Sequence, residues 1–139
     1  MRRNERGSAL IETAVTLPIL LLVSVAIFEF GRAYQTWQVL TNAAREGARI
    51  AVLPGSTEAT VSAAVRNYLT SGALPDAADA AITVDRNAAV GANTASRVTV
   101  DYPFEFMVLQ PVARLVSPGA QTGAPLTMRA VSIMRNETQ

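Results

Sequence analysis

The feature that most restricts the fold of this chain is a long uncharged stretch near its N-terminus. The segment from Thr13 to Phe28 is mostly apolar and lies between two acids, Glu12 and Glu29. Alone it is short for a bilayer core, which needs about 20 helical residues, whereas residues 8–30 are long enough. We therefore predict a membrane-spanning helix over 8–30.

The charges before this stretch predict its orientation. Arg2, Arg3 and Arg6 precede it and only Glu5 opposes them. Because basic residues are retained on the cytoplasmic side, residues 1–7 are expected to form a cytoplasmic leader. The predicted location is the cytoplasmic (inner) membrane, as a single-pass protein with its N-terminus inside and its C-terminal domain outside.

A removable secretory signal is the competing interpretation of the same stretch. The triplet "SVA" at 24–26 has the small residues of a cleavage site, after which the chain would begin at Ile27. An acid within the apolar region and Pro18 at its middle argue against this alternative.

The helical pattern continues beyond the predicted span, over residues 31–53. No proline occurs there before Pro54, and Ala, Arg, Gln and Leu are all acceptable in helices. Two stripes follow helical spacing, a polar one and one of small residues: Asn42, Arg45, Glu46 and Arg49, and Ala43, Gly47 and Ala51. Small residues permit close approach of another backbone. We favour packing of both stripes within this chain's own domain, with an intermolecular role as the alternative.

Residues 54–139 are expected to form an extracytoplasmic α+β domain. Pro54 and Gly55 end the long helix, and Ser56 or Thr57 can cap a short amphipathic helix that ends before Gly72.

Alternating patterns then predict strands at 81–86, 97–102 and 125–135. Residues 87–96 are expected to be a loop. Apolar residues on both faces of the third strand favour a central or helix-covered position. Before that strand we expect a loop with a short helical turn, whose large apolar side chains enter the core: Phe104, Phe106, Val112 and Leu115. The predicted fold is a long N-terminal helix, a short helix and an antiparallel sheet of about three strands packed on the upper part of the long helix.

Composition restricts the chemistry. The chain has no Cys and no His, and its net charge is +1. Thiolate and histidine catalysis are therefore excluded, and Asp76 with Asp79 are too few for a calcium site. We expect no enzymatic activity, no metal, no cofactor, no small-molecule substrate and no nucleic-acid partner.

The N-terminal "RGSALIET", the central "TNAAREGAR" and the terminal "MRNE" together resemble the TadE-like minor pilins, or pseudopilins, of tight-adherence (Tad) type IV pilus systems. The resemblance covers nearly the whole chain, with Asn42, Arg45, Glu46, Gly47 and Arg49 as its central motif. It implies cleavage by a prepilin peptidase between Gly7 and Ser8. It also implies that the partners are the lipid bilayer, other minor or major pilins and the inner-membrane assembly platform, with incorporation into a surface pilus.

The resemblance implies a role for Glu12. Cleavage would place it at the fifth mature position, where its carboxylate meets the new ammonium of Ser8, in its own chain or in a neighbour. The alternative is a helix-start residue that extends to the cytoplasmic interface. Glu29 is expected only to form an exposed or interfacial pair with Arg32. The alternative function is a non-polymerising, single-pass anchored binding protein or accessory secretion protein.

Overall fold

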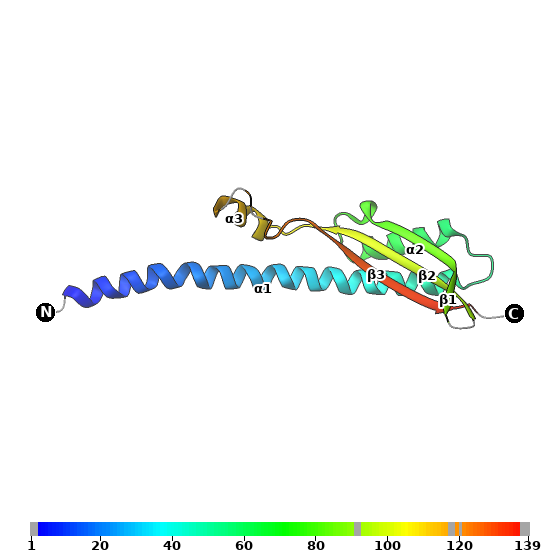
Figure 1. The fold of residues 1–139 in the computed structure, drawn as a ribbon, viewed down its shortest axis with the longest axis horizontal. Coiled ribbons are helices and arrows are strands. Elements are labelled where there is room, and N and C mark those ends of the chain that lie inside the picture. Colours follow the sequence, from blue (N-terminus) through cyan, green and yellow to red (C-terminus); the bar gives the residue numbers. More distant parts are fainter. Residues whose placement is uncertain (1–2, 91–92, 117–118, 120, 137–139) are drawn as a thin grey trace. The chain divides into compact units, whose positions relative to one another are not determined.

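The computed structural model describes residues 3–90, 93–116, 119 and 121–136. Its elements in chain order are α1 (Arg3–Ala51), α2 (Glu58–Ser71), the 3-10 turn η1 (Ala77–Asp79), β1 (Ala81–Val90), β2 (Asn93–Phe104), α3 (Leu109–Val116) and β3 (Leu126–Arg135). Figure 1 shows the long helix, the short helices and the single sheet. The predicted α+β fold is confirmed.

The chain divides into two compact units, which are described separately. Unit 1 comprises Met1–Arg32 and Phe106–Ala124, and unit 2 comprises Ala33–Glu105 and Pro125–Gln139. The first part of α1 and α3 therefore belong to unit 1. The second part of α1, α2 and the whole sheet belong to unit 2.

Helix α1 begins earlier and ends slightly sooner than the predicted 8–53. It passes through Pro18 without a break in its assignment. Three hydroxyl groups in its first part donate to carbonyl oxygens one turn earlier: Thr13 to Ala9 at 2.8 Å, Thr16 to Glu12 at 2.7 Å and Ser24 to Leu20 at 2.8 Å. These polar side chains are thus satisfied within the helix itself.

Helix α2 has the predicted ends. Thr57 is its N-cap, and its hydroxyl accepts a hydrogen bond from the Thr60 N–H at 3.2 Å. Gly72 is its C-cap, and Val39 side-chain atoms lie close to where a Cβ on Gly72 would project. Capping chemistry fixed both ends, which is why the sequence predicted them.

The three antiparallel strands have the order β1-β2-β3. The predicted loop over 87–96 is wrong, because pairing continues through Ala88↔Ala95 to Val90↔Asn93. The side chains of residues 87–96 are mostly small, so the apolar and polar alternation typical of a strand is weak there. The backbone N–H and carbonyl groups still pair between the strands. The register shifts between Asp85 and Ala88, which is a β-bulge.

Strand β3 is an edge strand, so the expectation of a central position is wrong. Ala130 is its one buried residue among those described, while Val131 and Ile133 are 50% and 46% exposed. Both of these residues lie on the same face as Arg129, which forms an ion pair with Asp101 at 2.6 Å across the strands. Asp101 thereby raises the pKa of the Arg129 guanidinium.

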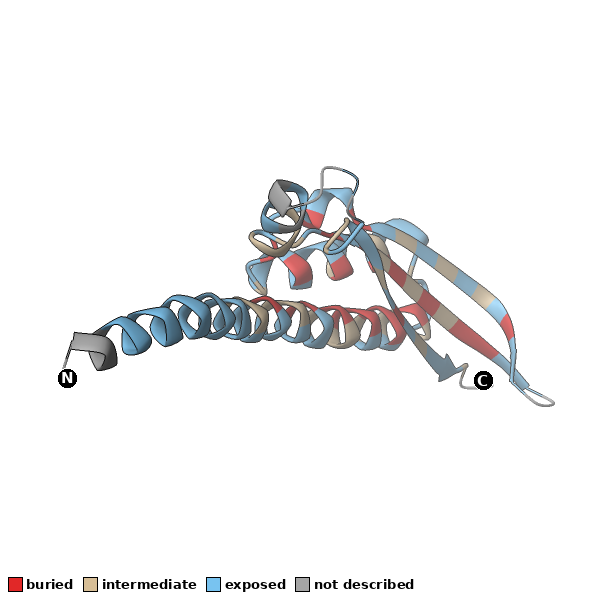
Figure 2. Ribbon diagram, turned by 60° about the vertical axis from the view of Figure 1, so that its left-hand side comes forward, coloured by how far each residue is buried: buried red, intermediate tan, exposed pale blue. Residues whose placement is uncertain are grey.

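The core of unit 2 lies between the sheet, α2 and the second part of α1. From β2 it receives Val98, Val100, Tyr102 and Phe104, and from α2 Val61, Val65 and Leu69. Figure 2 shows the buried residues along the second part of α1 and along β2. Of the expected core side chains that the structure describes, Phe104 alone is buried. Phe106 is half-buried, Val112 is exposed, and the side chain of Leu115 lies outside the described residues.

Asn136 ties the strands together beyond the end of β3. Its N–H donates to the Thr94 carbonyl at 3.2 Å, and its side-chain amide donates to the Arg86 carbonyl at the bulge, also at 3.2 Å. Its Oδ1 accepts from the buried Ser96 hydroxyl at 2.8 Å. We call this arrangement the Asn136 clasp. Through Asn136, the "MRNE" segment that ends β3 is therefore hydrogen-bonded to both β1 and β2.

Candidate functional site

The first part of α1 presents large apolar side chains to its surroundings. In the described residues one helix is long and apolar enough to cross a membrane; its most apolar window has a mean hydropathy of 2.3 and is 0% buried. Leu10 and Ile27 are among the most exposed, at 71% and 69%. A helix in a water-soluble core would instead be buried, so this exposure fits a single-pass membrane anchor.

The predicted cleavage position lies on an open helix surface. A Cβ added to Gly7 would meet nothing within 4 Å, and Ser8 is exposed. The bond between Gly7 and Ser8 itself lies within α1, and in the described part of the chain the space into which a side chain on Gly7 would project is open.

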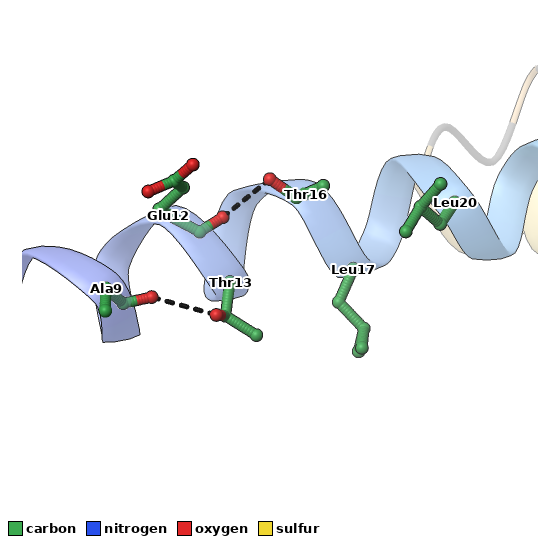
Figure 3. Close-up of a pocket in the computed structure, with 6 residues that line it drawn as sticks. All are labelled: Ala9, Glu12, Thr13, Thr16, Leu17 and Leu20. Carbon is green, nitrogen blue, oxygen red and sulfur yellow. Dashed lines mark hydrogen bonds between the residues drawn. The ribbon is translucent and has the colours of Figure 1, made fainter.

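Glu12 lies one helical turn after Ser8 and is also exposed. Among the described residues, its carboxylate has no hydrogen-bond or ion-pair partner. It lines a shallow groove of about 290 Å³ with Ala9, Thr13, Thr16, Leu17 and Leu20. Figure 3 shows its carboxylate directed away from the helix axis, with the two threonine hydroxyls turned to the backbone.

Glu29 differs from the expectation of an exposed or interfacial pair. Its side chain is 0% exposed, and its Oε2 lies 3.2 Å from the Arg32 guanidinium. Its Oε1 accepts a hydrogen bond from the Val108 N–H at 2.5 Å. Glu29 is thus a buried charge that requires compensation. The Arg32 guanidinium and the Val108 N–H supply it.

The position of Val108 explains why this contact suits a carboxylate. Val108 immediately precedes α3, and its carbonyl accepts the Val112 N–H at 3.0 Å, the first bond of that helix. The free N–H groups at a helix start favour a nearby anion. Glu29 therefore fastens the start of α3 to α1 within unit 1.

The small-residue stripe lies inside unit 2. Ala43, Gly47 and Ala51 are buried. A Cβ on Gly47 would lie 2.6 Å from Val65 Cγ2 and 3.1 Å from Val98 Cγ1. At this position α1 therefore approaches α2 and β2 too closely for a larger residue.

The polar residues of the same motif lie nearer the surface. Asn42 is half-buried and Arg45 is exposed. Arg49 forms two hydrogen bonds to Glu46, at 2.9 and 2.6 Å. These bonds lower the pKa of the Glu46 carboxyl and raise that of Arg49. The motif thus combines one packing glycine with a solvated ion pair.

Sequence reasoning missed the roles of two residues. The partner of Glu29 is 79 positions away, so no local pattern could reveal its burial. Asn136 was noticed only as part of "MRNE", although a single asparagine after an alternating strand is a possible terminator. Within the described chain, no cluster of three His, Cys, Asp or Glu residues is placed to hold a metal.

These observations define a class of protein: a small α+β domain joined to one long helix whose apolar part fits a single-pass membrane anchor. Residues 7–49 match the family described as TadE-like protein, which confirms the resemblance over that segment. The match begins at Gly7 and ends at Arg49, so it includes Glu12, Glu29 and the central motif. No curated protein and no solved structure matches the chain.

Proposed function

We propose that this protein is a processed minor pilin, or pseudopilin, that takes part in assembling a tight-adherence type IV pilus and has no catalytic activity. The observation that carries the proposal is the match of residues 7–49 to the TadE-like family, on a helix whose apolar side chains are exposed. An assembly subunit needs such a surface, because it leaves the bilayer only by packing against other subunits.

The proposed processing site is the bond between Gly7 and Ser8. The glycine has no side chain to obstruct a protease, and an added Cβ at this position would meet nothing within 4 Å. Cleavage by a prepilin peptidase would leave Ser8 with a free ammonium group and retain the apolar helix. The leader, residues 1–7, would stay in the cytoplasm and the α+β domain would lie outside, as the arginines predict.

The proposed role of Glu12 is to pair with that ammonium. An unpaired carboxylate inside the bilayer costs several kcal/mol, roughly 2.5–3.5 on insertion scales. The described chain supplies no partner for Glu12, whereas it supplies two for Glu29. A charge created by cleavage, on the same chain or on an incoming subunit, would fill that need.

Processing is tested by intact mass and N-terminal sequencing of the protein from membranes, with and without a co-expressed prepilin peptidase. We expect a chain that begins at Ser8 only when the peptidase is present. Gly7→Val should block this cleavage. Gly31→Val is the matched control, since a Cβ at Gly31 also meets nothing within 4 Å.

Two other results would contradict the proposal. A chain that keeps Met1 in both conditions and is absent from filaments would support the non-polymerising anchored binding or accessory protein. A chain that begins at Ile27 would identify the apolar stretch as a removable signal.

Assembly is tested with Glu12→Ala. The variant should insert into the membrane in normal amounts but enter pili poorly, because the ammonium of Ser8 loses its partner. Glu58→Ala, at an exposed position that begins α2, is the control. Normal pilus assembly by Glu12→Ala would exclude the pairing.

A further inference from the structure

Helix α3 shares an apolar cavity with the predicted membrane span. Within unit 1, a cavity of about 260 Å³ is lined by Pro18, Leu21, Leu22 and Val25 of α1 and by Leu109 and Val112 of α3. All six side chains are apolar. The α1 residues among them lie well inside 8–30, not at its end.

This places α3 at the depth of the bilayer. At 1.5 Å per residue, Val25 and Pro18 lie roughly 8 and 18 Å along the helix from Phe30. Half of a hydrocarbon core is about 15 Å thick. Pro18 therefore lies near the bilayer midplane, and side chains that line one cavity with Leu21, Leu22 and Val25 lie within the leaflet on the Phe30 side.

The exposed side chains of this segment suit such a position. Met107 and Val112 are 64% and 42% exposed, and Arg114, on the opposite side of α3 from Val112, is exposed too. In such a position the apolar side chains contact acyl chains, and the long arginine side chain extends toward the headgroups.

The polar backbone at the start of α3 is also prepared for a medium without water. An unsatisfied N–H in hydrocarbon costs several kcal/mol. The Val108 N–H is bonded to Glu29, and Glu29 itself is neutralised by Arg32. Gly123 lies against the backbone of Gln110, where an added Cβ would be 2.8 Å from its nitrogen, so the return segment covers this end closely.

We propose that α3 is a second membrane contact of this protein, embedded beside α1 in the leaflet on the Phe30 side of the bilayer midplane, with a lipid acyl chain over the cavity between them. Lipid is the occupant because the cavity opens from the lipid-facing surface of the span itself. The proposal depends on the membrane span and not on pilus assembly.

The test uses the full chain in phosphatidylcholine and phosphatidylglycerol vesicles that contain lipids with nitroxide-labelled acyl chains. Since the chain has no cysteine, single cysteines can carry a bimane fluorophore. Val112→Cys is the test position. Val131→Cys is the matched control, another exposed valine but on the sheet, and Leu21→Cys reports on the span.

We expect the nitroxide lipids to remove most of the bimane emission at residues 112 and 21 and none of it at residue 131. Emission at 112 as strong as at 131, with residue 21 quenched, would overturn the proposal while leaving the span intact. An unquenched label at 21 would overturn the span and this proposal together. Quenching at 112 that appears only when the protein is diluted in lipid would assign the face to a second copy and overturn the lipid assignment.

Discussion

The two parts of α1 are one continuous helix but are built for different surroundings. Before Arg32 the outward side chains are large and branched, such as Leu21 and Ile27, and they stay exposed. After Ala33 most of the apolar side chains buried against the domain are small, such as Ala44 and Ala48, and Leu40 is the large one among them. Large apolar residues suit a fluid solvent such as lipid, and small ones permit close packing on fixed neighbours. The size of the apolar side chains therefore distinguishes the two parts of α1 better than their hydrophobicity does.

The largest expected effect compares two leucines of α1. Leu40 is 0% exposed and Leu21 is 58% exposed. Leu40→Ala should destabilise unit 2 by about 2–5 kcal/mol, because it leaves a cavity in a packed core. Leu21→Ala should leave the unfolding of unit 2 unchanged. Chemical unfolding of the full chain in detergent micelles measures both, and equal losses would contradict the comparison.

The next effect concerns Glu29, a charged residue that is buried in the first part of α1. Glu29→Ala removes the acceptor of the Val108 N–H and should cost about 1.5–3 kcal/mol locally. At 1.4 kcal/mol per factor of ten, the amide of Val108 should exchange its hydrogen roughly 10 to 100 times faster. Glu12→Ala is the control. Unchanged exchange at Val108 in Glu29→Ala would show that α3 does not depend on Glu29.

A pair of glycines tests how closely each part of α1 packs. The Cβ of a side chain at Gly47 would meet Val65 and Val98, whereas a Cβ at Gly31 would meet nothing within 4 Å. Gly47→Leu should destabilise unit 2 by about 1–3 kcal/mol through overpacking. Gly31→Leu should have no such effect in the same unfolding measurement. A tolerated Gly47→Leu would mean that α1 can move away from α2 without loss.

The smallest effect is electrostatic and depends on pH. Arg49 lowers the pKa of Glu46 in the folded state. The pair therefore adds stability above the ordinary pKa of a glutamate, 4.5, and this stability is lost as the pH falls through the lowered value. Unfolding of the wild type and of Glu46→Gln should differ slightly at neutral pH and converge in acid. Glu12→Gln, which removes no described ion pair, should follow the wild type throughout.

Local chemistry made much of the fold predictable, and long-range contacts made the rest unpredictable. Thr57 and Gly72 defined α2 because capping acts within one turn. The alternation of Val98, Val100 and Tyr102 defined β2 because one face of it is buried. The edge position of β3 could not be predicted, since an apolar strand can lie at an edge when its partners are fixed elsewhere.

The candidate site was predictable to the same extent. Glu12 was found because an acid stands inside an apolar stretch, and Gly7 and Ser8 because the leader resembles that of a family; their proposed processing and pairing stay predictions. The burial of Glu29 was not predicted, because the pattern of charges along the chain does not show that the Val108 N–H donates to its carboxylate. The bulge at Arg86 was not predicted, because the Arg86 carbonyl accepts its hydrogen bond from Asn136, which is distant in the sequence.

The Asn136 clasp has a consequence for the order of folding during synthesis. Ribosomes make the chain from its N-terminus, so Arg86, Thr94 and Ser96 emerge well before the asparagine that joins them. Until residue 136 has emerged, the outer edge of β2 has no partner strand and the buried Ser96 hydroxyl has no acceptor from Asn136. From the synthesis of β2 until that of β3, the nascent domain therefore presents an open strand edge to chaperones or neighbouring chains.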